Sequence, residues 1–344
     1  MLPNLALFYP EGHQSHYQPG HPERPQRVEA IREAFVEAKL WETFTHLEPL
    51  KLSTADLSHV HSPRLLTRLE KACANSSPID LDTYTTPQSW QLALSAAGGG
   101  ASVAKAVWEK QKLRGLALTR PPGHHATQQR AMGFCLLNNI AIAADYVLRH
   151  TSATKLAIID IDLHHGNGTQ DIFWERGDVF YISTHQYPYY PGTGALRETG
   201  AGAGQKTTAN FPLPPMSGDK AFASIMEEAI LPLLDRYVPE MLLVSYGFDA
   251  HWRENLGHLQ LSARGYADLI AHLTTWADNN CEGRIALFLE GGYDLPAAKA
   301  CSMGVVAALQ GLAWEDPIGP APTPESDGWK AVLSEAKRIW KLGN

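Results

Sequence analysis

The stretch KLAIIDIDLHHGNGTQD, residues 155–171, changes from apolar to polar halfway along its length. Its first half is a nearly unbroken run of Leu, Ala and Ile, which is typical of a strand buried on both faces of a parallel sheet. Asp160, Asp162, His164 and His165 then follow at the end of this strand. Because a buried carboxylate is costly without a compensating partner, we expect cations or hydrogen-bond donors close to this point.

Three other apolar runs have the same form and end in Gly, Pro, Asp or His: GLALT at 115–119, EMLLVSYGFD at 240–249 and RIALFLEGGYD at 284–294. Weaker strand patterns occur at 5–9 and 179–184. Helical patterns lie between the strands, at 24–40, 62–74, 88–110, 134–149, 218–236, 262–279 and 295–311. This alternation predicts an α/β fold, a three-layer sandwich with a central, mainly parallel sheet.

The composition is that of an ordinary globular protein, with 44% hydrophobic and 19% charged residues. We expect one domain over residues 1–344, in which 313–344 form a C-terminal connection and a last helix. The net charge of -7, without a cluster of basic residues, argues against binding to nucleic acid and mildly favours a cationic ligand. The oligomeric state is left open by the sequence.

The sequence contains no apolar stretch approaching the roughly 18 residues of a membrane span. The segment MLPNLALFYPEGH at residues 1–13 lacks the basic start of a secretory signal. The four cysteines are widely spaced without a C-x-x-C pair, which suits reduced thiols and predicts a cytoplasmic location. Any metal ion must therefore be held by histidines and carboxylates.

The unusual polar residues follow the four strong strands. RPPGHHAT follows the first, IDLHHGNG the second, Asp249 the third and GGYD the fourth. Ligands bind beyond the carboxyl ends of the strands in open parallel sheets. We therefore expect one functional site at this edge of the sheet.

Asp162 and His164 are two residues apart, so on an extended backbone both side chains point to the same side and can bind one ion. Asp249, at the end of another strand, supplies a possible third ligand. Three N and O ligands with an open position are typical of catalytic zinc. An isolated D-x-H step is more often a hydrogen-bonded strand end, but the other strand ends favour the metal site.

The adjacent His124 and His125 follow a stiff loop of two prolines and a glycine, and Asp160 and Asn167 are candidate partners for them. A carboxylate partner fixes the tautomer of a histidine and raises its basicity, whereas an amide orients it without adding charge. Two histidines with unlike partners could separate acid and base roles, although such a pair can also be a surface accident.

Tyr293 follows two glycines, so its hydroxyl sits on a tight turn that can approach the metal site. A phenol there could donate a hydrogen bond to a developing oxyanion. A single tyrosine is more often a packing residue, but its place at the sheet edge favours the functional interpretation.

Several long motifs in sequence order resemble the zinc-dependent histone deacetylase and acetylpolyamine amidohydrolase superfamily. They are HPERPQRVEAI, RPPGHHA, GFCLLNNIAIAA, DIDLHHGNGTQDIF, YPGTG, YGFDAH and LEGGYD, and they span most of the chain. The resemblance implies the arginase/deacetylase fold and a hydrolase that releases acetate from an acetylated amine.

The resemblance also implies residue roles. Asp162, His164 and Asp249 match the zinc ligands, His124 and His125 the catalytic histidines with Asp160 and Asn167 behind them, and Tyr293 the catalytic tyrosine. Phe134 and Tyr190 match the aromatic walls of the acyl-lysine channel, and Gly133 the carbonyl that accepts the substrate amide proton. Asn at 167 is similar to class II enzymes, and tyrosine at 293 implies full activity. In such an enzyme His125 would be the general base, His124 would act electrostatically or as a proton shuttle, and zinc and Tyr293 would stabilise the oxyanion.

The family also carries a structural potassium ion. Its ligands would be backbone oxygens near Asp160, Asp162 and His164, the Ser183 side chain and the Thr184 carbonyl. Cations at this point would neutralise the carboxylates that the strand end buries.

Two substrate classes stay open, acetyl-lysine in proteins or peptides and small acetylated amines such as acetylpolyamines. Polyamine-selective relatives place a glutamate a few residues after the third zinc ligand, whereas RENLG places Leu256 there and Glu254 two residues earlier. This difference favours acetyl-lysine. Asp82 is either a rim acid that holds the substrate backbone or a turn residue at the start of a helix.

Two other classes of protein fit less well. An arginase-like enzyme needs a second metal and further Asp ligands, which HHGN and FDAH lack. A non-catalytic acyl-lysine reader would be expected to lose Tyr293 or one histidine, and this sequence has all three.

Overall fold

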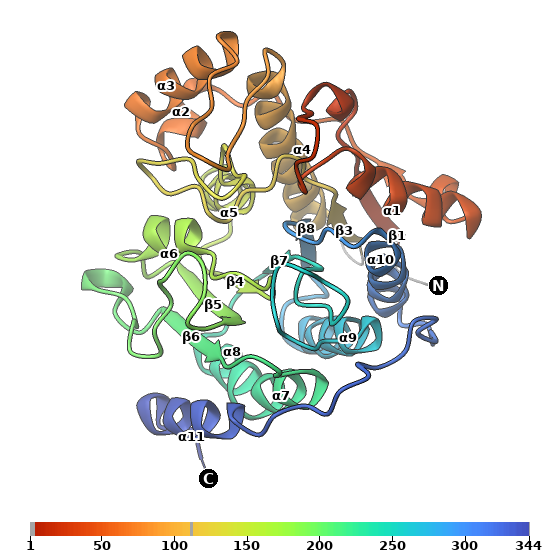
Figure 1. Ribbon diagram of the computed structural model, residues 1–344. Helices are drawn as coiled ribbons and strands as arrows, with labels where there is room; N and C mark the ends of the chain where they lie inside the picture. Colours follow the sequence, from red (N-terminus) through yellow and green to blue (C-terminus); the bar gives the residue numbers. More distant parts are fainter. Residues whose placement is uncertain (1–3, 111–112, 344) are drawn as a thin grey trace.

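The apolar runs form the centre of one parallel sheet in the computed structural model, which describes residues 4–110 and 113–343 (Figure 1). Within these ranges the strands are β1 (Asn4–Phe8), β2 (Thr45–His46), β3 (Leu113–Ala117), β4 (Leu156–Asp160), β5 (Val179–Gln186), β6 (Thr208–Leu213), β7 (Leu242–Tyr246) and β8 (Ile285–Leu289). Their order is β2-β1-β3-β8-β7-β4-β5-β6, and every neighbouring pair is parallel. The predicted fold class is confirmed.

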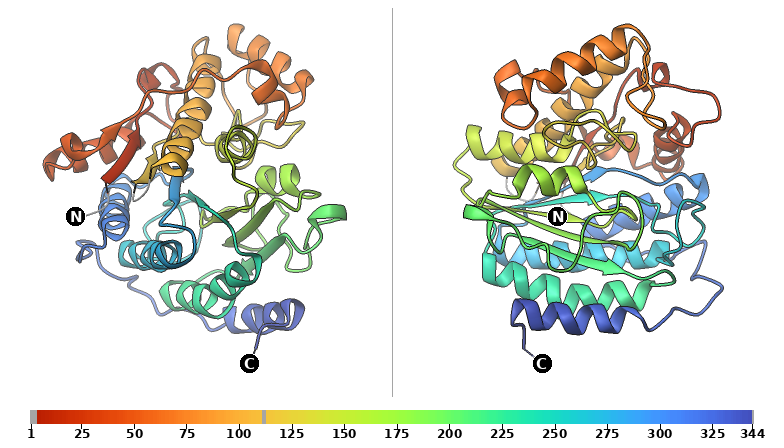
Figure 2. Two further views of the ribbon diagram at one scale, coloured as in Figure 1. Left: turned by 180° about the vertical axis from the view of Figure 1, so that it is seen from behind. Right: turned by 60° about the vertical axis from the view of Figure 1, so that its left-hand side comes forward.

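Helices cover both faces of the sheet, and Figure 2 shows the three layers from the side. One face carries α2 (Thr54–Ser58), α3 (Pro63–Ala74), α4 (Ser89–Glu109), α5 (Asn139–His150) and α6 (Asn167–Phe173). The other face carries α1 (Gln26–Glu37), α7 (Asp219–Ile225), α8 (Leu231–Tyr237), α9 (Ala263–Asn280), α10 (Leu295–Gln310) and α11 (Trp329–Trp340). A π-helical turn, Met226–Ile230, joins α7 to α8, and three 3-10 turns complete the helices: His13–Ser15, Trp41–Thr43 and Gly202–Gly204.

The apolar run of β4 is divided between two cores, one on each face. Ala157 and Ile159 pack in the core with α9 and α10, whereas Ile158 packs in the core with α4 and α5. All three are fully buried, because successive side chains of a strand point to opposite faces. A strand covered on both sides needs an unbroken apolar sequence, which explains why this stretch gave so strong a signal.

Some elements differ from the sequence-based expectations. β2, β6, α2 and α6 were not predicted, and β3 lies at 113–117 instead of 115–119. The helix predicted at 134–149 begins only at Asn139, because Asn138 caps it by accepting the Ala141 amide and Phe134 has a positive φ of 68°. β6 was not predicted because its sequence, TANFPL, has no continuous apolar run and contains Pro212, which is tolerated at the edge of the sheet.

The C-terminal helix α11 packs against β6, at one edge of the sheet. Trp340 packs near Phe180, and Glu335 forms an ion pair of 2.7 Å with Arg197. Residues 313–328 connect this helix to α10 without helix or strand of their own. The division into one domain with a C-terminal segment stays a prediction. Residues 1–3 of the segment 1–13 and residue 344 of the segment 313–344 lie outside the described ranges.

Among the described residues, no helix combines the length and apolar character needed to cross a membrane. The four cysteines are free and buried.

Candidate active site

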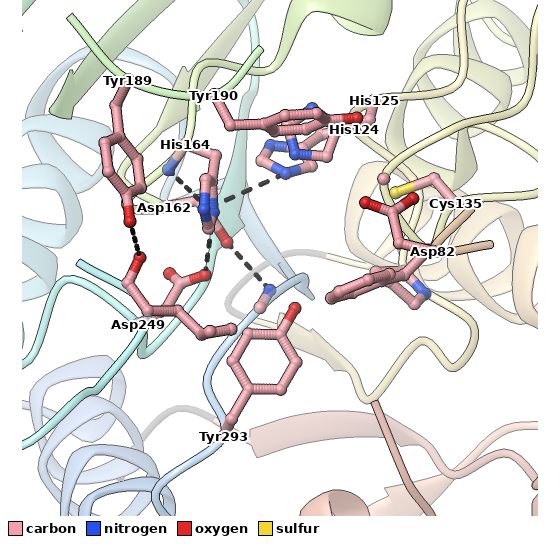
Figure 3. A pocket seen from close by; sticks show the side chains of 15 residues that line it. Asp82, His124, His125, Cys135, Asp162, His164, Tyr189, Tyr190, Asp249 and Tyr293 are labelled. Carbon is pink, nitrogen blue, oxygen red and sulfur yellow. Dashed lines mark hydrogen bonds and ion pairs between the residues drawn. The ribbon is translucent and has the colours of Figure 1, made fainter. Parts of the chain in front are cut away.

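Four neighbouring strands, β3, β8, β7 and β4, deliver polar side chains to one cavity of about 300 Å³ at their carboxyl ends (Figure 3). Its lining consists of Asp82, Pro122, His124, His125, Gly133, Phe134, Cys135, Asp162, His164, Tyr189, Tyr190, Asp249, Leu256, Gly291 and Tyr293. The sheet order therefore joins residues that are far apart in the sequence, as expected for the carboxyl edge of a parallel sheet.

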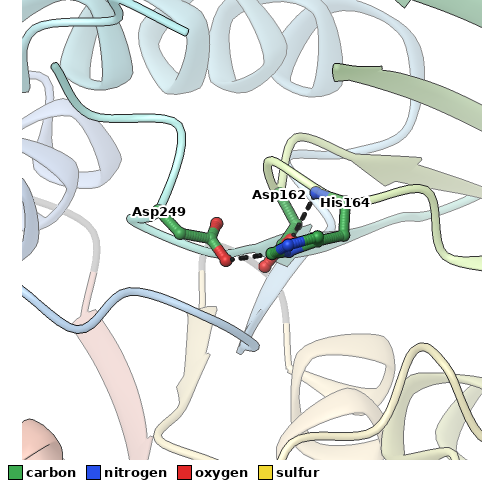
Figure 4. Close-up of side chains that lie close together, drawn as sticks. All are labelled: Asp162, His164 and Asp249. Atoms are coloured by element: carbon green, nitrogen blue, oxygen red, sulfur yellow. Dashed lines mark hydrogen bonds and ion pairs between the residues drawn. The ribbon is translucent and has the colours of Figure 1, made fainter. Parts of the chain in front are cut away.

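Asp162, His164 and Asp249 form a compact group of possible metal ligands, drawn in Figure 4. One ligand atom from each lies within 4.8 Å of the other two. His164 Nδ1 lies 3.2 Å from Asp162 Oδ1 and 3.2 Å from Asp249 Oδ2. Backbone amides hold both carboxylates, since Gly291 donates to Asp162 (2.9 Å) and Leu163 donates to Asp249 (3.0 Å).

The chemistry of this group fits a divalent cation. Asp249 Oδ2 is buried, and apart from its 3.2 Å contact with His164 Nδ1 it has no hydrogen-bond partner among the described residues. Burial and the nearby charge of Asp162 raise the pKa of Asp249 to about 6, so two unneutralised carboxylates are unfavourable here. One nitrogen and two carboxylate oxygens are a ligand set that zinc accepts.

Two glycines make room for these carboxylates. A Cβ atom on Gly247 would lie 1.8 Å from Asp162 Oδ2, and one on Gly291 would lie 2.0 Å from Asp249 Oδ2. Neither position can carry a side chain while both aspartates keep this arrangement.

His124 and His125 lie side by side with ring centres 4.0 Å apart, and their partners differ. His124 Nδ1 is 3.0 Å from Asp160 Oδ2, whereas His125 Nδ1 is 2.8 Å from Asn167 Oδ1. An amide oxygen only accepts, so His125 Nδ1 carries a proton and Nε2 is left with a lone pair.

The charges around the two histidines also differ. Burial opposes a charge on His124, but the carboxylates of Asp160, Asp162 and Glu290 outweigh it and raise the pKa of His124 to about 10. Burial and the positive charges of His124 and His164 lower the pKa of His125 well below its usual value. The surroundings therefore favour the charged form of His124 and the neutral form of His125.

Tyr293 lies on the irregular loop after β8, and its hydroxyl points into the cavity (Figure 3). Burial raises the pKa of Tyr293 well above its usual range, so the phenol keeps its proton and can donate it in a hydrogen bond. Its ring meets Phe134 edge to face at 5.9 Å, and the Arg27 guanidinium lies 4.8 Å from the ring centre.

Phe134 and Tyr190 lie on the cavity wall, and Tyr190 packs edge to face against His125 at 5.2 Å. Gly133 precedes Phe134 with a φ of +57°, and a Cβ atom at this position would lie 2.5 Å from His125 Cδ2. The close approach of the backbone to the His125 ring therefore requires glycine here.

Asp82 lines the cavity and is exposed, while its carbonyl lies 3.0 Å from His21 Nε2. It is not at the start of a helix, because α4 begins at Ser89. Leu256 also lines the cavity. Glu254 does not line it, and its carboxylate accepts hydrogen bonds from the backbone amides of Tyr293 and Asp294.

The residues expected around potassium lie beside the metal group. Ser183 is the register partner of Asp160 across β4 and β5, and the Thr184 hydroxyl donates to the Asp160 carbonyl at 3.4 Å. The Ser183 hydroxyl also contacts His185 Nδ1 at 2.9 Å. Potassium itself stays a prediction.

Sequence reasoning missed several contributors to the site. Tyr189 and Cys135 line the cavity directly beside the predicted Tyr190 and Phe134. Glu290 is fully buried and accepts hydrogen bonds from the Gly123 and His124 amides, at 2.6 and 3.0 Å. Its place in LEGGYD, at the end of a buried strand, was a signal for a structural carboxylate.

Comparison with known proteins agrees with this geometry. The profile of the histone deacetylase domain matches residues 21–309. The chain belongs to the histone deacetylase family. A probable deacetylase of Archaeoglobus fulgidus is 38% identical over 309 residues, which cover 89% of this chain and 86% of the relative.

Other relatives of this deacetylase come from plants and bacteria. Histone deacetylase 14, chloroplastic, of Arabidopsis thaliana is 38% identical, with 88% of this chain and 75% of that protein covered. The histone deacetylase-like amidohydrolase of Pseudomonas aeruginosa is 31% identical, with 87% and 80% covered. The crystal structure of the HDA15 HD domain superimposes with a TM-score of 0.89 at 31% identity, covering 98% of this chain and 94% of that domain.

These relatives support the interpretation of the site as that of a hydrolytic deacetylase. The arginase/deacetylase fold predicted from the motifs is confirmed by the structural match. The family profile and its relatives imply acetylated amides as substrates.

Proposed function

We propose that this deacetylase uses one zinc ion to remove acetyl groups from the ε-amine of lysine in proteins or peptides. The observation that carries the proposal is that three possible metal ligands, two histidines with unlike partners and one phenol line a single cavity. Asp162, His164 and Asp249 would hold the ion.

A bound zinc ion would supply Lewis-acid polarisation of the acyl carbonyl and of the attacking water. His125 is the proposed general base, because it is neutral and its Nε2 lone pair is free while Nδ1 donates to Asn167. His124, paired with Asp160, would contribute positive charge and shuttle a proton to the leaving amine.

Tyr293 is the proposed oxyanion donor. Its phenol is protonated at any physiological pH and points into the cavity, so it can stabilise negative charge that develops on the acyl oxygen. Because the hydrogen bond strengthens as charge develops, the contribution falls mainly on kcat.

The walls suit a thin apolar chain with a polar end. Phe134 and Tyr190 offer aromatic surface to the methylene groups of an acyl-lysine, and the Gly133 carbonyl would accept the substrate amide proton. At the rim, the exposed carboxylate of Asp82 would hold the substrate backbone.

A structural potassium ion would occupy the neighbouring position formed by Asp160, Asp162, His164, Ser183 and Thr184. The proposal is supported by the burial of two carboxylates beside Ser183 and Thr184, because a cation there would lower their desolvation cost.

The second candidate function is acetylpolyamine hydrolysis, and Leu256 argues against it. An apolar side chain on the cavity wall cannot bind the second ammonium group of an acetylated polyamine, and Glu254 is occupied by backbone amides.

A cytoplasmic location also stays a proposal, supported by four unpaired cysteines, although two of the relatives are chloroplastic.

The test compares substrates side by side. Purified protein reconstituted with zinc is assayed on acetyl-lysine peptides, on N8-acetylspermidine and on lysine peptides with longer acyl chains. We expect kcat/KM to be highest for one of the lysine peptides and to vanish on chelation. Higher kcat/KM for the polyamine would overturn the substrate assignment, and no hydrolysis of any substrate would overturn the function.

A further inference from the structure

Glu254 lies two residues from the cavity-lining Leu256, yet Glu254 is not among the residues that line the cavity. It is 9% exposed, and its Oε2 atom accepts hydrogen bonds from the backbone amides of Tyr293 (2.7 Å) and Asp294 (3.1 Å). The second oxygen accepts the Asn255 amide at 3.1 Å. A carboxylate thus binds the backbone of the one loop that carries the proposed oxyanion donor.

This loop has no regular structure that could hold it. Residues 290–294 belong to neither strand nor helix, and Gly292 has a φ of +107°. Amides of such a loop that have no backbone partner need another acceptor, and a hydrogen bond to a charged acceptor is about twice as strong as one to a neutral acceptor. Glu254 provides this acceptor at the residue whose side chain would contact substrate.

The loop is held from its other side by Arg27. The guanidinium donates to the Gly292 carbonyl at 2.6 Å and to the Glu290 carbonyl, and it lies under the Tyr293 ring. Arg27 thus fixes the carbonyls before Tyr293, and Glu254 fixes the amides at and after it. With both in place, the phenol is held in one position.

We propose that Glu254 is a positioning residue, which acts on catalysis through Tyr293 by holding its backbone. The inference rests on the proposed function, because it requires Tyr293 to be the oxyanion donor. Glu254 lies only two residues from Leu256, the position at which polyamine-selective relatives carry a glutamate. The proposal nevertheless gives Glu254 a role other than the recognition of a cationic substrate.

The kinetic test is a double-mutant cycle of Glu254→Leu and Tyr293→Phe. Each single variant is expected to lower kcat about tenfold with little change in KM, and the double variant is expected to match Tyr293→Phe within about twofold. Glu254→Gln, which keeps an acceptor oxygen, is expected to recover most of the kcat. Asn255 is exposed and lies next to Glu254 on the loop after β7, so Asn255→Ala serves as the matched control and is expected to leave the activity unchanged.

Two results would overturn the proposal. If the losses multiply in the double variant, Glu254 supports the fold and does not act through Tyr293. If Glu254→Gln raises KM for N8-acetylspermidine but not for an acetyl-lysine peptide, Glu254 recognises charge on the substrate.

A second measurement does not depend on activity. Amide hydrogen exchange at Tyr293 and Asp294 is expected to speed up in Glu254→Leu and to stay slow in Glu254→Gln and Asn255→Ala. Unchanged exchange in Glu254→Leu would overturn the positioning role. An inactive parent enzyme with the expected exchange pattern would instead disprove the function and leave the loop contact intact.

Discussion

Unlike partners give two adjacent histidines different chemistry. The carboxylate behind His124 favours its charged form, whereas the amide behind His125 leaves that ring neutral. The sequence was enough to suggest both partners, because Asp160 and Asn167 lie within the same strand-end motif. LEGGYD indicated a structural carboxylate at Glu290, but its contacts with the Gly123 and His124 amides could not be predicted, since they depend on β8 lying beside β3 in the sheet.

Tyr293 is the residue whose removal tests the chemistry most directly. We expect Tyr293→Phe to lower kcat at least about tenfold, because the oxyanion loses a donor while the ring and its packing remain. Zinc content, measured by atomic absorption, should not change, since the substitution leaves the possible ligands Asp162, His164 and Asp249 intact. Full turnover in this variant would remove the proposed oxyanion role.

The loops that follow the strands are the elements on which the site depends. The four strong strands were predictable because burial on both faces demands continuous apolar sequence. The conformations of the loops were harder to predict, because they depend on single contacts. The segment 134–138, for example, was expected to be helical, but Phe134 adopts a left-handed conformation at the cavity wall. Glu254 was ambiguous for the same reason, as only the folded loop shows that it faces inward.

The loop after β8 makes a steric prediction. Gly291→Ala would place a Cβ atom 2.0 Å from Asp249 Oδ2, so the aspartate or the loop must move. We expect zinc affinity to fall by about 10- to 100-fold, measured by competition with a chromophoric chelator. Gly328→Ala is the control, because the nearest neighbours of its Cβ would be Pro214 at 3.0 Å and Ser326 at 3.9 Å, neither of which lines the cavity. Equal zinc affinity in the two variants would contradict the geometry.

The loop after β7 makes a prediction about specificity. Leu256→Glu would add a carboxylate to the cavity wall, where it could pair with the distal ammonium of an acetylated polyamine. We expect the ratio of kcat/KM for N8-acetylspermidine to that for an acetyl-lysine peptide to rise about tenfold. Leu256→Gln has the same shape without the charge and should leave the ratio nearly unchanged. If both variants behave alike, charge at this position does not select the substrate.

At the scale of the whole molecule, the two cores bury several histidines outside the proposed machinery. Burial is the largest influence on His13, His16 and His61, and it lowers the pKa of each to about 4. The two hydrogen bonds of His61 require its neutral form. Nδ1 lies 2.9 Å from the Thr127 carbonyl, and Nε2 accepts a hydrogen bond from the Asn138 amide at 2.9 Å. A second proton would remove that acceptor.

This burial sets the pH dependence of stability. An unfolded histidine binds its proton near pH 6.5 and these folded ones near pH 4, so the stability present at neutral pH is lost as the pH falls through that window. Each such histidine is expected to cost about 2 kcal/mol of unfolding free energy between pH 7 and pH 5. Urea unfolding in EDTA at both pH values measures the loss, and His61→Gln should make it smaller. An identical loss in the variant would contradict the assignment.

The packing of α11 on β6 has a consequence for handling the protein. β6 is a border strand, and a border strand with open amides and carbonyls can recruit the same strand from another molecule. The helix α11 packs against β6 on one face of the sheet, and the partly exposed Arg197–Glu335 ion pair joins it to the loop after β5. We expect a chain that ends at residue 312 to self-associate more readily, because apolar side chains of β6 lose the cover of α11, although every candidate catalytic residue is still present.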